Sequence, residues 1–269
     1  MNLYDMFHTR YLLHRRAYKH KATMIIEDMI VEALKKANDH FLVKGKDGKQ
    51  MKMSKAIHDM VAYTKLTDDI TLQIMRSDKP KLKESQDILK RIQKRQFYKL
   101  IGEAQPQEGV ILEKKSIPEW KTDIVSALDS DVDGPKPTVD QLVIHLVDFN
   151  YGMKQEDPIQ HVRFYSKKKP QEAFRLLESE VSVMLPKSFA EQQIRVYYKT
   201  QDLDEVTQAK ELEQQEKKVQ QATECFDKWK DNKFKAGKVS NLELTPQRTS
   251  NTDTPPTLVR KVKRSLIMD

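Results

Sequence analysis

The chain has 269 residues, a formal net charge of +8 and one cysteine, Cys225. A single cysteine excludes a disulfide framework and a zinc site built from cysteines, and it fits a reducing compartment. Hydrophobic residues make up 38% and charged residues 33%, which predicts a folded part with a solvated tail. No apolar run approaches the roughly 18 residues that a membrane span needs. The positive charge favours an anionic partner, such as a nucleotide, a nucleic acid or an acidic protein.

The first hundred residues are predicted to be mostly helical. Apolar residues recur at helical spacing from Met24 to Leu34, and neither glycine nor proline occurs before Gly45, so residues 1–41 are expected to form helix. Because this pattern starts almost at Met1, we expect the chain to be the C-terminal part of a longer protein. The glycines at 45–49 predict a turn between short extended pieces. These pieces are 41–43 and 50–53, and the helices expected after them are 54–76 and 80–100.

The next hundred residues favour strands. Gly102–Thr138 contains four prolines and is expected to be irregular, apart from a strand expected at 110–112. Residues 141–150 are richest in β-forming side chains. Connections between the strands are too short for parallel crossovers, so pairing is expected to be antiparallel. The other strands are expected at 161–166, 172–176 and 194–198, with a short helix at 179–184.

The last part of the chain is strongly charged. A thin apolar stripe predicts one helix at 202–229. From Asp231 onward the chain is polar and contains prolines, so it is expected to be flexible. The fold class that follows is α+β and predominantly helical.

Basic and aromatic residues gather near the start of the chain. Arg10, His14 and Tyr18 lie at i, i+4 and i+8, and therefore share one face of the expected helix. A guanidinium holds phosphate oxygens in a fork, an imidazole donates a hydrogen bond, and a tyrosine ring offers a flat wall. This face suits a polyphosphate with a sugar attached. The alternative is a solvated basic helix with Tyr18 packed in the core. The surrounding basic residues are Arg15, Arg16, Lys19, His20 and Lys21.

His58 and Asp59 form a His-Asp pair, a pattern found in metal sites. Neighbouring residues on a helix point about 100° apart, and no further His or Asp at suitable spacing lies nearby. A surface or capping role is therefore expected, and no metal ligands are expected in this chain. His40, His145 and His161 are isolated and are interpreted as structural.

Five blocks of sequence, in order, resemble the vertebrate family of SAM- and HD-domain-containing deoxynucleoside triphosphate triphosphohydrolases. The blocks are MNLYDMFHTR with LHRRAYKHK, AYTKLTDDI (62–70), RQFYKLIGE (95–103), DFNYGM (148–153) and FAEQQIRVYYK (189–199). The resemblance covers about residues 1–200. It implies two regions: the last helices of an all-α HD-type catalytic domain (1–104) and an α+β lobe (105–200). The charged helix (201–230) and the flexible tail (231–269), both predicted from the sequence pattern, lie beyond the resemblance.

The resemblance also implies an activity. Enzymes of this family cut a deoxynucleoside triphosphate (dNTP) into deoxynucleoside and triphosphate, with a divalent metal (Mn, Mg, Fe or Zn) held by residues upstream of the matched part. Arg10 would contact the substrate triphosphate and His14 would lie near the scissile phosphate. Tyr18 would pack against the sugar. Lys19 replaces a glutamine that faces the base, so base contacts there are in question.

Regulation is implied as well, because the family forms a tetramer bridged by GTP and dNTP activators. One regulatory nucleotide would be held by Asn2, Arg16, His20, Lys21 and Lys167. Arg95 and Lys99 would hold its guanine neighbour, although their alternative interpretation is a salt-bridged helical face. Asp5 and His8 would lie at a subunit contact.

The tail carries two short motifs. Thr245 precedes Pro246 and Arg248 in the pattern of a proline-directed phosphorylation site. The basic run 260–264 fits a nuclear import signal, a nucleic-acid contact or a solvated charge run, and a nuclear location is expected. The alternative to the enzyme is a non-catalytic module that binds single-stranded nucleic acid or serves oligomerisation.

Overall fold

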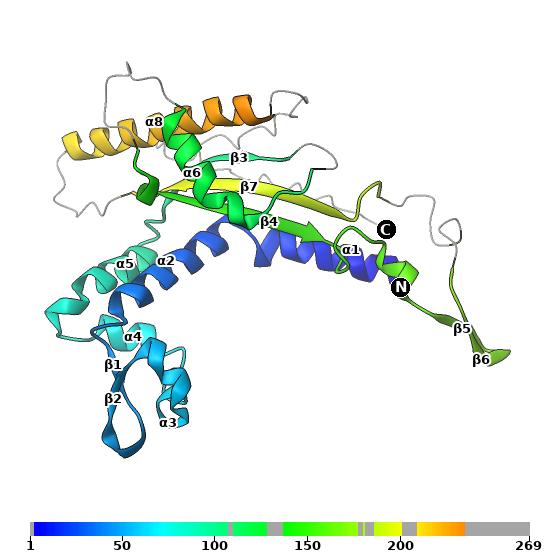
Figure 1. Ribbon diagram of the computed structural model, residues 1–269, viewed down its shortest axis with the longest axis horizontal. Coiled ribbons are helices and arrows are strands. Elements are labelled where there is room, and N and C mark those ends of the chain that lie inside the picture. The colour runs from blue at the N-terminus through cyan, green and yellow to red at the C-terminus, as the bar shows by residue number, and fades with distance from the viewer. Residues whose placement is uncertain are drawn as a thin grey trace, which may run out of the picture. The chain divides into compact units, whose positions relative to one another are not determined.

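The computed structural model describes residues 3–106, 110–127, 137–176, 180, 186–200 and 209–234, all within the compact unit formed by residues 1–237. Helices and antiparallel sheets are mixed along the chain, which confirms the α+β class (Figure 1). Asn2, Thr245, the basic run 260–264 and all of the predicted helix at 179–184 except Glu180 lie outside the described residues. Within the described part, none of the helices combines the length and apolar composition needed to cross a membrane.

The N-terminal helical segment is interrupted. α1 (Leu3–Leu13) continues into a π-helical turn (His14–Tyr18), and α2 (Lys21–Ala37) begins after a break. His20 in the break has an extended backbone (φ −64°, ψ 144°), and its side chain accepts a hydrogen bond from the Ala22 N–H at 3.2 Å. The prediction of one helix over residues 1–41 is wrong, because His20 caps a new helix.

One stripe of α2 is buried against α5 (Lys83–Gln93). The stripe consists of Ile25, Met29, Ala33 and Ala37, spaced four residues apart. The Ser85 hydroxyl on α5 donates to the carbonyl of Ala33 at 2.7 Å. This close approach is allowed because small residues occupy the last two turns of the stripe.

A small hairpin and short helices follow α2. β1 (Leu42–Lys44) and β2 (Gln50–Lys52) pair antiparallel around a turn, as predicted. The helix predicted at 54–76 is wrong, because the segment is divided. Its pieces are a 3-10 turn (Met53–His58), α3 (Met60–Tyr63) and α4 (Ile70–Met75). Asp59 causes the first division, since its backbone is extended (φ −138°, ψ 106°) and its side chain caps α3.

The helix predicted at 80–100 ends early. A 3-10 turn (Pro80–Leu82) leads into α5, which stops at Gln93. Arg95 then has a positive φ of 59°, and the Gln96 N–H donates back to the Arg91 carbonyl at 2.9 Å. A residue with a positive φ, usually glycine, commonly ends a helix, and Arg95 has this role here. The chain is then extended from Lys99, where a strand begins.

A three-stranded antiparallel sheet forms the centre of the fold, in the order β3-β7-β4. The strands are β3 (Lys99–Ala104), β7 (Ala190–Tyr198) and β4 (Leu142–Asn150). β4 was predicted almost to the residue, and the strand predicted at 194–198 is the end of the longer β7. β3 was missed, and residues 110–112 form no strand. A separate hairpin pairs β5 (Phe164–Ser166) with β6 (Lys169–Phe174), close to the predicted positions.

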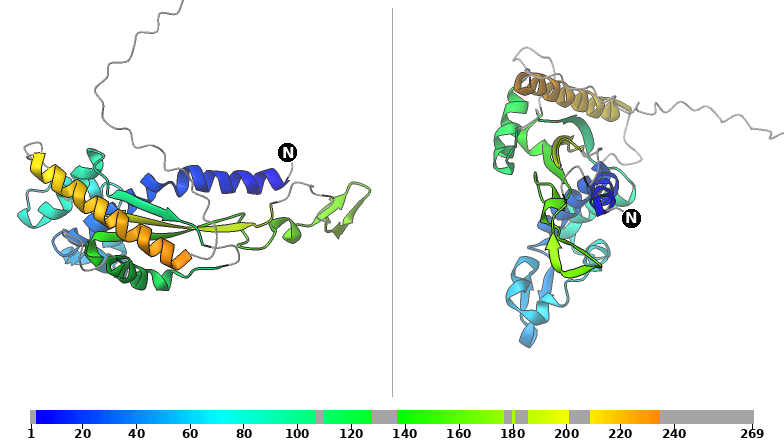
Figure 2. Two further views of the ribbon diagram at one scale, coloured as in Figure 1. Left: turned by 90° about the horizontal axis from the view of Figure 1, so that it is seen from above. Right: turned by 90° about the vertical axis from the view of Figure 1, so that its right-hand side faces the viewer.

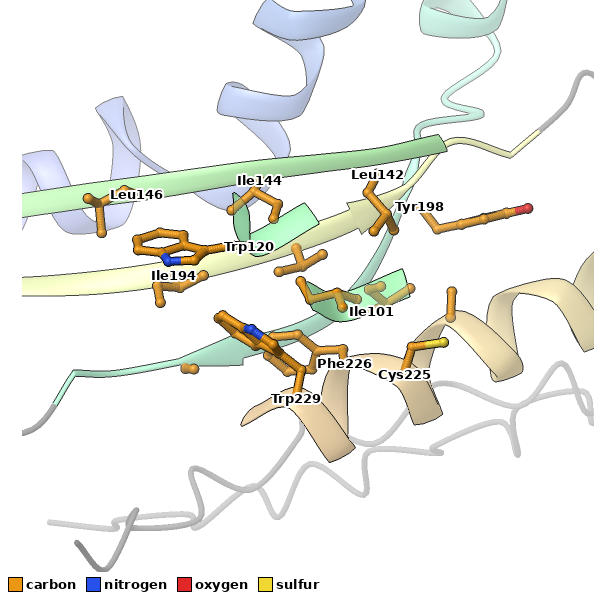
Figure 3. Close-up of a cluster of buried hydrophobic side chains, with 14 of the residues drawn as sticks. Ile101, Trp120, Leu142, Ile144, Leu146, Ile194, Tyr198, Cys225, Phe226 and Trp229 are labelled. Carbon is orange, nitrogen blue, oxygen red and sulfur yellow. The ribbon is translucent and has the colours of Figure 1, made fainter. Parts of the chain in front are cut away.

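The two faces of this sheet pack against different helices (Figure 1, Figure 2). Alternate residues, including Ile144, Ile194 and Val196, enter a core formed with α6 (Ile117–Ser126) and α8 (Ala209–Phe234) (Figure 3). α6 was missed because Pro118 was taken as a break, although proline is favoured in the first turn of a helix. α8 continues to Phe234, past the predicted end at Trp229, while residues 202–208 lie outside the described part.

The opposite face of the sheet is more polar and meets α2 and the break before it. Val143 and Tyr197 contribute to the core shared with α2 and α5. His145 and Arg195 are directly paired across β4 and β7. The His145 ring contacts the Asp28 carboxylate of α2 through Nε2, so the structural role predicted for His145 is confirmed.

Candidate functional site

The π-helical turn brings His14 and Tyr18 into contact. Their ring centroids are 5.2 Å apart. The two residues were predicted to share a face of an α-helix; they lie instead at the two ends of a π turn, which also brings their rings together. Tyr18 is 62% exposed, so its placement in a core, which was the alternative interpretation, is wrong. His14 Nδ1 is buried and has no hydrogen-bond partner among the described residues.

Arg10 adds a guanidinium beside this pair. Its Nη1 donates to the Asn150 carbonyl at 2.9 Å, at the end of β4. The adjacent Gly152 has a positive φ of 106°, and a Cβ there would lie 4.0 Å from Arg10 Cζ. Burial lowers the pKa of His14, and the charges of Arg10 and Lys19 lower it further. His14 is therefore a neutral imidazole at pH 7 in a cationic environment.

Lys19 extends the cationic cluster toward β4. Its ammonium donates to the Asp148 carbonyl and lies 5.8 Å from the centroid of the Phe149 ring. Burial lowers the pKa of Lys19, Asp148 opposes that shift, and Arg10 and Lys114 lower the pKa further. Lys114 therefore belongs electrostatically to the same cluster. It was missed because nothing in the sequence pattern relates residue 114 to residue 19.

The cations predicted for a regulatory nucleotide lie in two separate segments. Arg16, His20 and Lys21 are exposed in the π turn and at the start of α2. Lys167 lies in the turn between β5 and β6 and is also exposed. The first three are close in sequence and structure, whereas no described contact brings Lys167 to them.

Arg95 lies in the short segment that joins α5 to β3, and Lys99 lies at the start of β3. The Arg95 guanidinium is 5.9 Å from the Phe97 ring centroid, and Lys99 is the exposed first residue of β3. The alternative interpretation, a salt-bridged helical face, is wrong because both residues lie beyond the end of the helix.

Asp5 and His8, predicted to lie at a subunit contact, occupy α1. His8 Nδ1 is 2.7 Å from the Tyr151 hydroxyl, which also contacts the Tyr4 hydroxyl at 3.2 Å. Burial is the main cause that raises the pKa of Tyr151. Asp5 is exposed. His8 thus tethers α1 to the loop after β4, which is a role within the chain that the sequence did not indicate.

The capping interpretation of the His58-Asp59 pair is confirmed for Asp59. Its carboxylate accepts hydrogen bonds from the N–H groups of Val61 at 2.9 Å and Ala62 at 3.1 Å, and from Lys46 at 2.9 Å. These bonds lower the pKa of the carboxyl. In the part of the chain that the structure describes, no group of three or more His, Cys, Asp or Glu side chains is arranged to hold a metal ion.

No family model matches the chain, but one class of protein matches it over most of its length: the deoxynucleoside triphosphate triphosphohydrolases. With the Homo sapiens protein of that name, SAMHD1, the chain is 38% identical over 99% of its residues. With SAMHD1 of Xenopus laevis it is 39% identical over 94%, and with a SAMHD1 homologue of Dictyostelium discoideum 31% identical over 77%.

The chain spans 42%, 39% and 37% of the length of these three relatives, respectively. The part that it matches is C-terminal, and the chain is SAMHD1-like throughout the matched region. The family resemblance inferred from the five sequence blocks is thereby confirmed.

Proposed function

We propose that this chain carries the substrate-binding and regulatory residues of a dNTP triphosphohydrolase, with 1–104 as the last part of an HD-type catalytic domain. The observation that carries the proposal is the cluster of Arg10, His14 and Lys19 beside the exposed Tyr18 ring. Several cationic or donating groups around one aromatic face suit a triphosphate joined to a sugar. The names of the relatives support the same substrate class.

Each side chain has a distinct part in this proposal. The Arg10 guanidinium grips two oxygens of the triphosphate, and the Lys19 ammonium neutralises charge beside it. His14, neutral at pH 7 because its pKa is lowered, gives a hydrogen bond to a phosphate oxygen. The Tyr18 ring lies flat against the deoxyribose, where the 2′-hydroxyl of a ribose would collide with it.

The divalent metal (Mn, Mg, Fe or Zn) implied by the family does not fit the described residues, since they hold no suitable ligand group. In the proposal its ligands come from residues outside this chain. The prediction is direct: purified chain supplied with Mn²⁺ or Mg²⁺ releases no triphosphate from dGTP. Turnover that scales with chain concentration would contradict the proposal about the ligands.

Regulation by nucleotides forms the second part of the proposal. Asn2, Arg16, His20, Lys21 and Lys167 bind a dNTP activator, and Arg95 and Lys99 bind GTP. Polyphosphates between cationic surfaces cancel their charge and join subunits into a tetramer, with Asp5 and His8 at the contact. The proposed location is the nucleus. Light scattering of the chain with and without GTP and dATP tests assembly, which should increase only when both are present.

A binding experiment tests the substrate site. Equilibrium titration of the chain with dGTP should show binding about tenfold weaker for Arg10→Ala, which loses a charge-assisted contact, and for Tyr18→Ala, which loses the ring beside the deoxyribose. Lys90→Ala is the matched control, because Lys90 is an exposed cation on α5. Equal affinity in wild type, Arg10→Ala and Tyr18→Ala would remove both residues from the site. Stronger binding of a single-stranded oligonucleotide than of dGTP, lost as salt rises, would favour the nucleic-acid module instead.

A further inference from the structure

The guanidinium of Arg195 is buried in the middle of β7, on the sheet face that meets α2. Arg195 is 6% exposed, and its Nε lies 3.0 Å from Glu103 Oε1 on β3. Its Nε and Nη2 donate to Gln193 Oε1 at 3.2 and 2.8 Å. Its Nη1 donates to the main-chain carbonyl of Lys19 at 2.6 Å. The guanidinium carbon also lies 5.9 Å from the Phe149 ring centroid.

The carbonyl of Lys19 marks the point where the π turn ends and the chain turns into α2. Carbonyls at the end of a helical segment lack a partner within that segment. Arg195 supplies that partner from a strand far away in the sequence. We call residues 18–21 the joint, because they connect the π turn to α2.

Two further contacts hold the joint to the same sheet. Tyr197, two residues along β7 and on the same face, donates its hydroxyl to the Lys21 carbonyl at 3.1 Å. The Lys19 side chain donates to the Asp148 carbonyl on β4. Lys19 is therefore held through its main chain by β7 and through its side chain by β4. Neighbouring strands thus fix both the path of the joint and the direction of its side chains.

The chemistry of Arg195 favours a geometric role over a purely stabilising one. An ion pair with a buried member stabilises a fold little compared with apolar side chains of similar volume, because the buried charge, here that of Arg195, loses its hydration, while the Glu103 side chain stays 33% exposed. Its benefit lies in geometry: the guanidinium is planar, and its donors point in fixed directions. With Glu103 and Gln193 fixing the plane of the guanidinium, Nη1 is directed toward α2, where it donates to the Lys19 carbonyl at 2.6 Å and lies 3.8 Å from Met24 Sδ.

We infer that Arg195 is a positioning residue, which fixes the joint so that Tyr18 and Lys19 face the bound substrate nucleotide. The inference has two parts: Arg195 positions the joint (the positioning half), and the positioned joint helps to bind the nucleotide (the nucleotide half). The nucleotide half rests on the proposed function. The positioning half does not, since it concerns the chain without ligand. Tyr197 assists by holding the Lys21 carbonyl.

Hydrogen exchange of the ligand-free chain tests the positioning half. Arg195→Met removes the donors and keeps an apolar stem, and we expect amide exchange at residues 19–24 to rise about tenfold, as for a local opening. Val196→Ala is the matched control, because Val196 is the next residue on β7, fully buried, and faces the opposite core. It should lower the melting temperature without changing exchange at the joint. Equal exchange at the joint in the two variants would overturn the inference.

A conservative variant separates charge from geometry. Arg195→Lys keeps a positive charge beside Glu103 but cannot donate to three acceptors in one plane. Compared with Arg195→Met, it should recover more of the wild-type melting temperature than of the wild-type protection from hydrogen exchange at residues 19–24. Full recovery of that protection by lysine would overturn the argument from guanidinium geometry.

Titration with dGTP tests the nucleotide half. Arg195→Met should bind dGTP about tenfold more weakly than wild type, as expected when groups that contact the ligand are no longer pre-organised, while Val196→Ala binds as wild type does. Failure of the wild-type chain to bind would contradict the proposed function, yet the exchange result would still decide the positioning role. Faster exchange with unchanged dGTP affinity would overturn the link between the joint and the nucleotide.

Discussion

Gly102 on β3 lies directly beneath the ring of Phe226 on α8. A Cβ at Gly102 would come within 2.1 Å of Phe226 Cε1, far inside contact distance. Phe226 is 1% exposed and packs against Trp229, with ring centroids 5.9 Å apart. The glycine therefore sets how closely α8 approaches the sheet.

Gly102→Ala should destabilise the fold by about 1–3 kcal/mol, the usual cost of adding a methyl group to a packed core. Urea denaturation measures the change. Phe226→Leu opens space at the same point, so the double variant should lose less stability than the sum of the two single variants. Strict additivity would show that the two residues do not compete for this space.

The pKa of His14 should rise when one of its cationic neighbours is removed. Burial, Arg10 and Lys19, in that order, lower the pKa of His14 below the ordinary 6.5. Arg10→Gln should raise that pKa toward 6.5, which an NMR titration of the imidazole protons can measure. Arg76→Gln removes the same charge at the end of α4 and should leave the pKa unchanged. A lower pKa in Arg10→Gln would contradict the electrostatic picture.

The same shift of the His14 pKa predicts how stability depends on pH. The unfolded chain takes up a proton near pH 6.5, whereas folded His14 takes it up only at lower pH. Between those two values the unfolded state binds more protons, so the free energy of unfolding rises with pH and then levels off above about 6.5. His14→Gln should remove this part of the dependence, as measured by denaturation at several pH values.

Asp59 should stabilise the junction of the small hairpin and α3 through its three backbone hydrogen bonds. Asp59→Ala should lower the melting temperature by a few degrees, and Asp59→Asn by less, because asparagine also caps helices. These bonds lower the carboxyl pKa below 3.8. The stabilisation is therefore present above about pH 3.8 and is lost as pH falls below it. An unchanged melting temperature in Asp59→Ala would contradict the capping role.

Lys114 should contribute to nucleotide binding through its charge alone. Lys114→Ala should weaken dGTP binding by about threefold at low salt, in the range of exposed charge pairs. The difference should disappear at about 0.5 M salt, where screening is strong. Lys115→Ala is the matched control, since Lys115 is adjacent but pairs with Glu113 at 2.5 Å. Equal losses in both variants would indicate a general effect of net charge.

Local patterns predicted a good part of the fold. The strand at 141–150 and the turn at 45–49 follow from residues close together in sequence, and both occur where expected. The break at His20, the end of α5 at Gln93 and strand β3 were missed. Each depends on a backbone conformation or a partner that periodicity does not encode, such as the positive φ of Arg95 or the pairing of β3 with β7.

Only those residues of the candidate site that are close together in the sequence were predicted. Arg10, His14 and Tyr18 stand out because they are close in sequence, and the structure brings His14 and Tyr18 into contact. Asn150, Lys114 and Arg195 join the same region from more than ninety residues away, and no spacing rule connects them to it. Long-range contacts of this kind arise from the packing of a sheet on a helix.

The alternation along β7 has an evolutionary consequence. Neighbouring positions on the strand have different roles. Ile194 and Val196 pack in the core beneath α8, while Arg195 and Tyr197 donate hydrogen bonds to the main-chain carbonyls of Lys19 and Lys21. Inserting or deleting one residue within the strand would turn it over, send the guanidinium among the tryptophans and leave those carbonyls unpaired. A change in the length of β7 is therefore expected to disrupt the fold more than a single substitution within it.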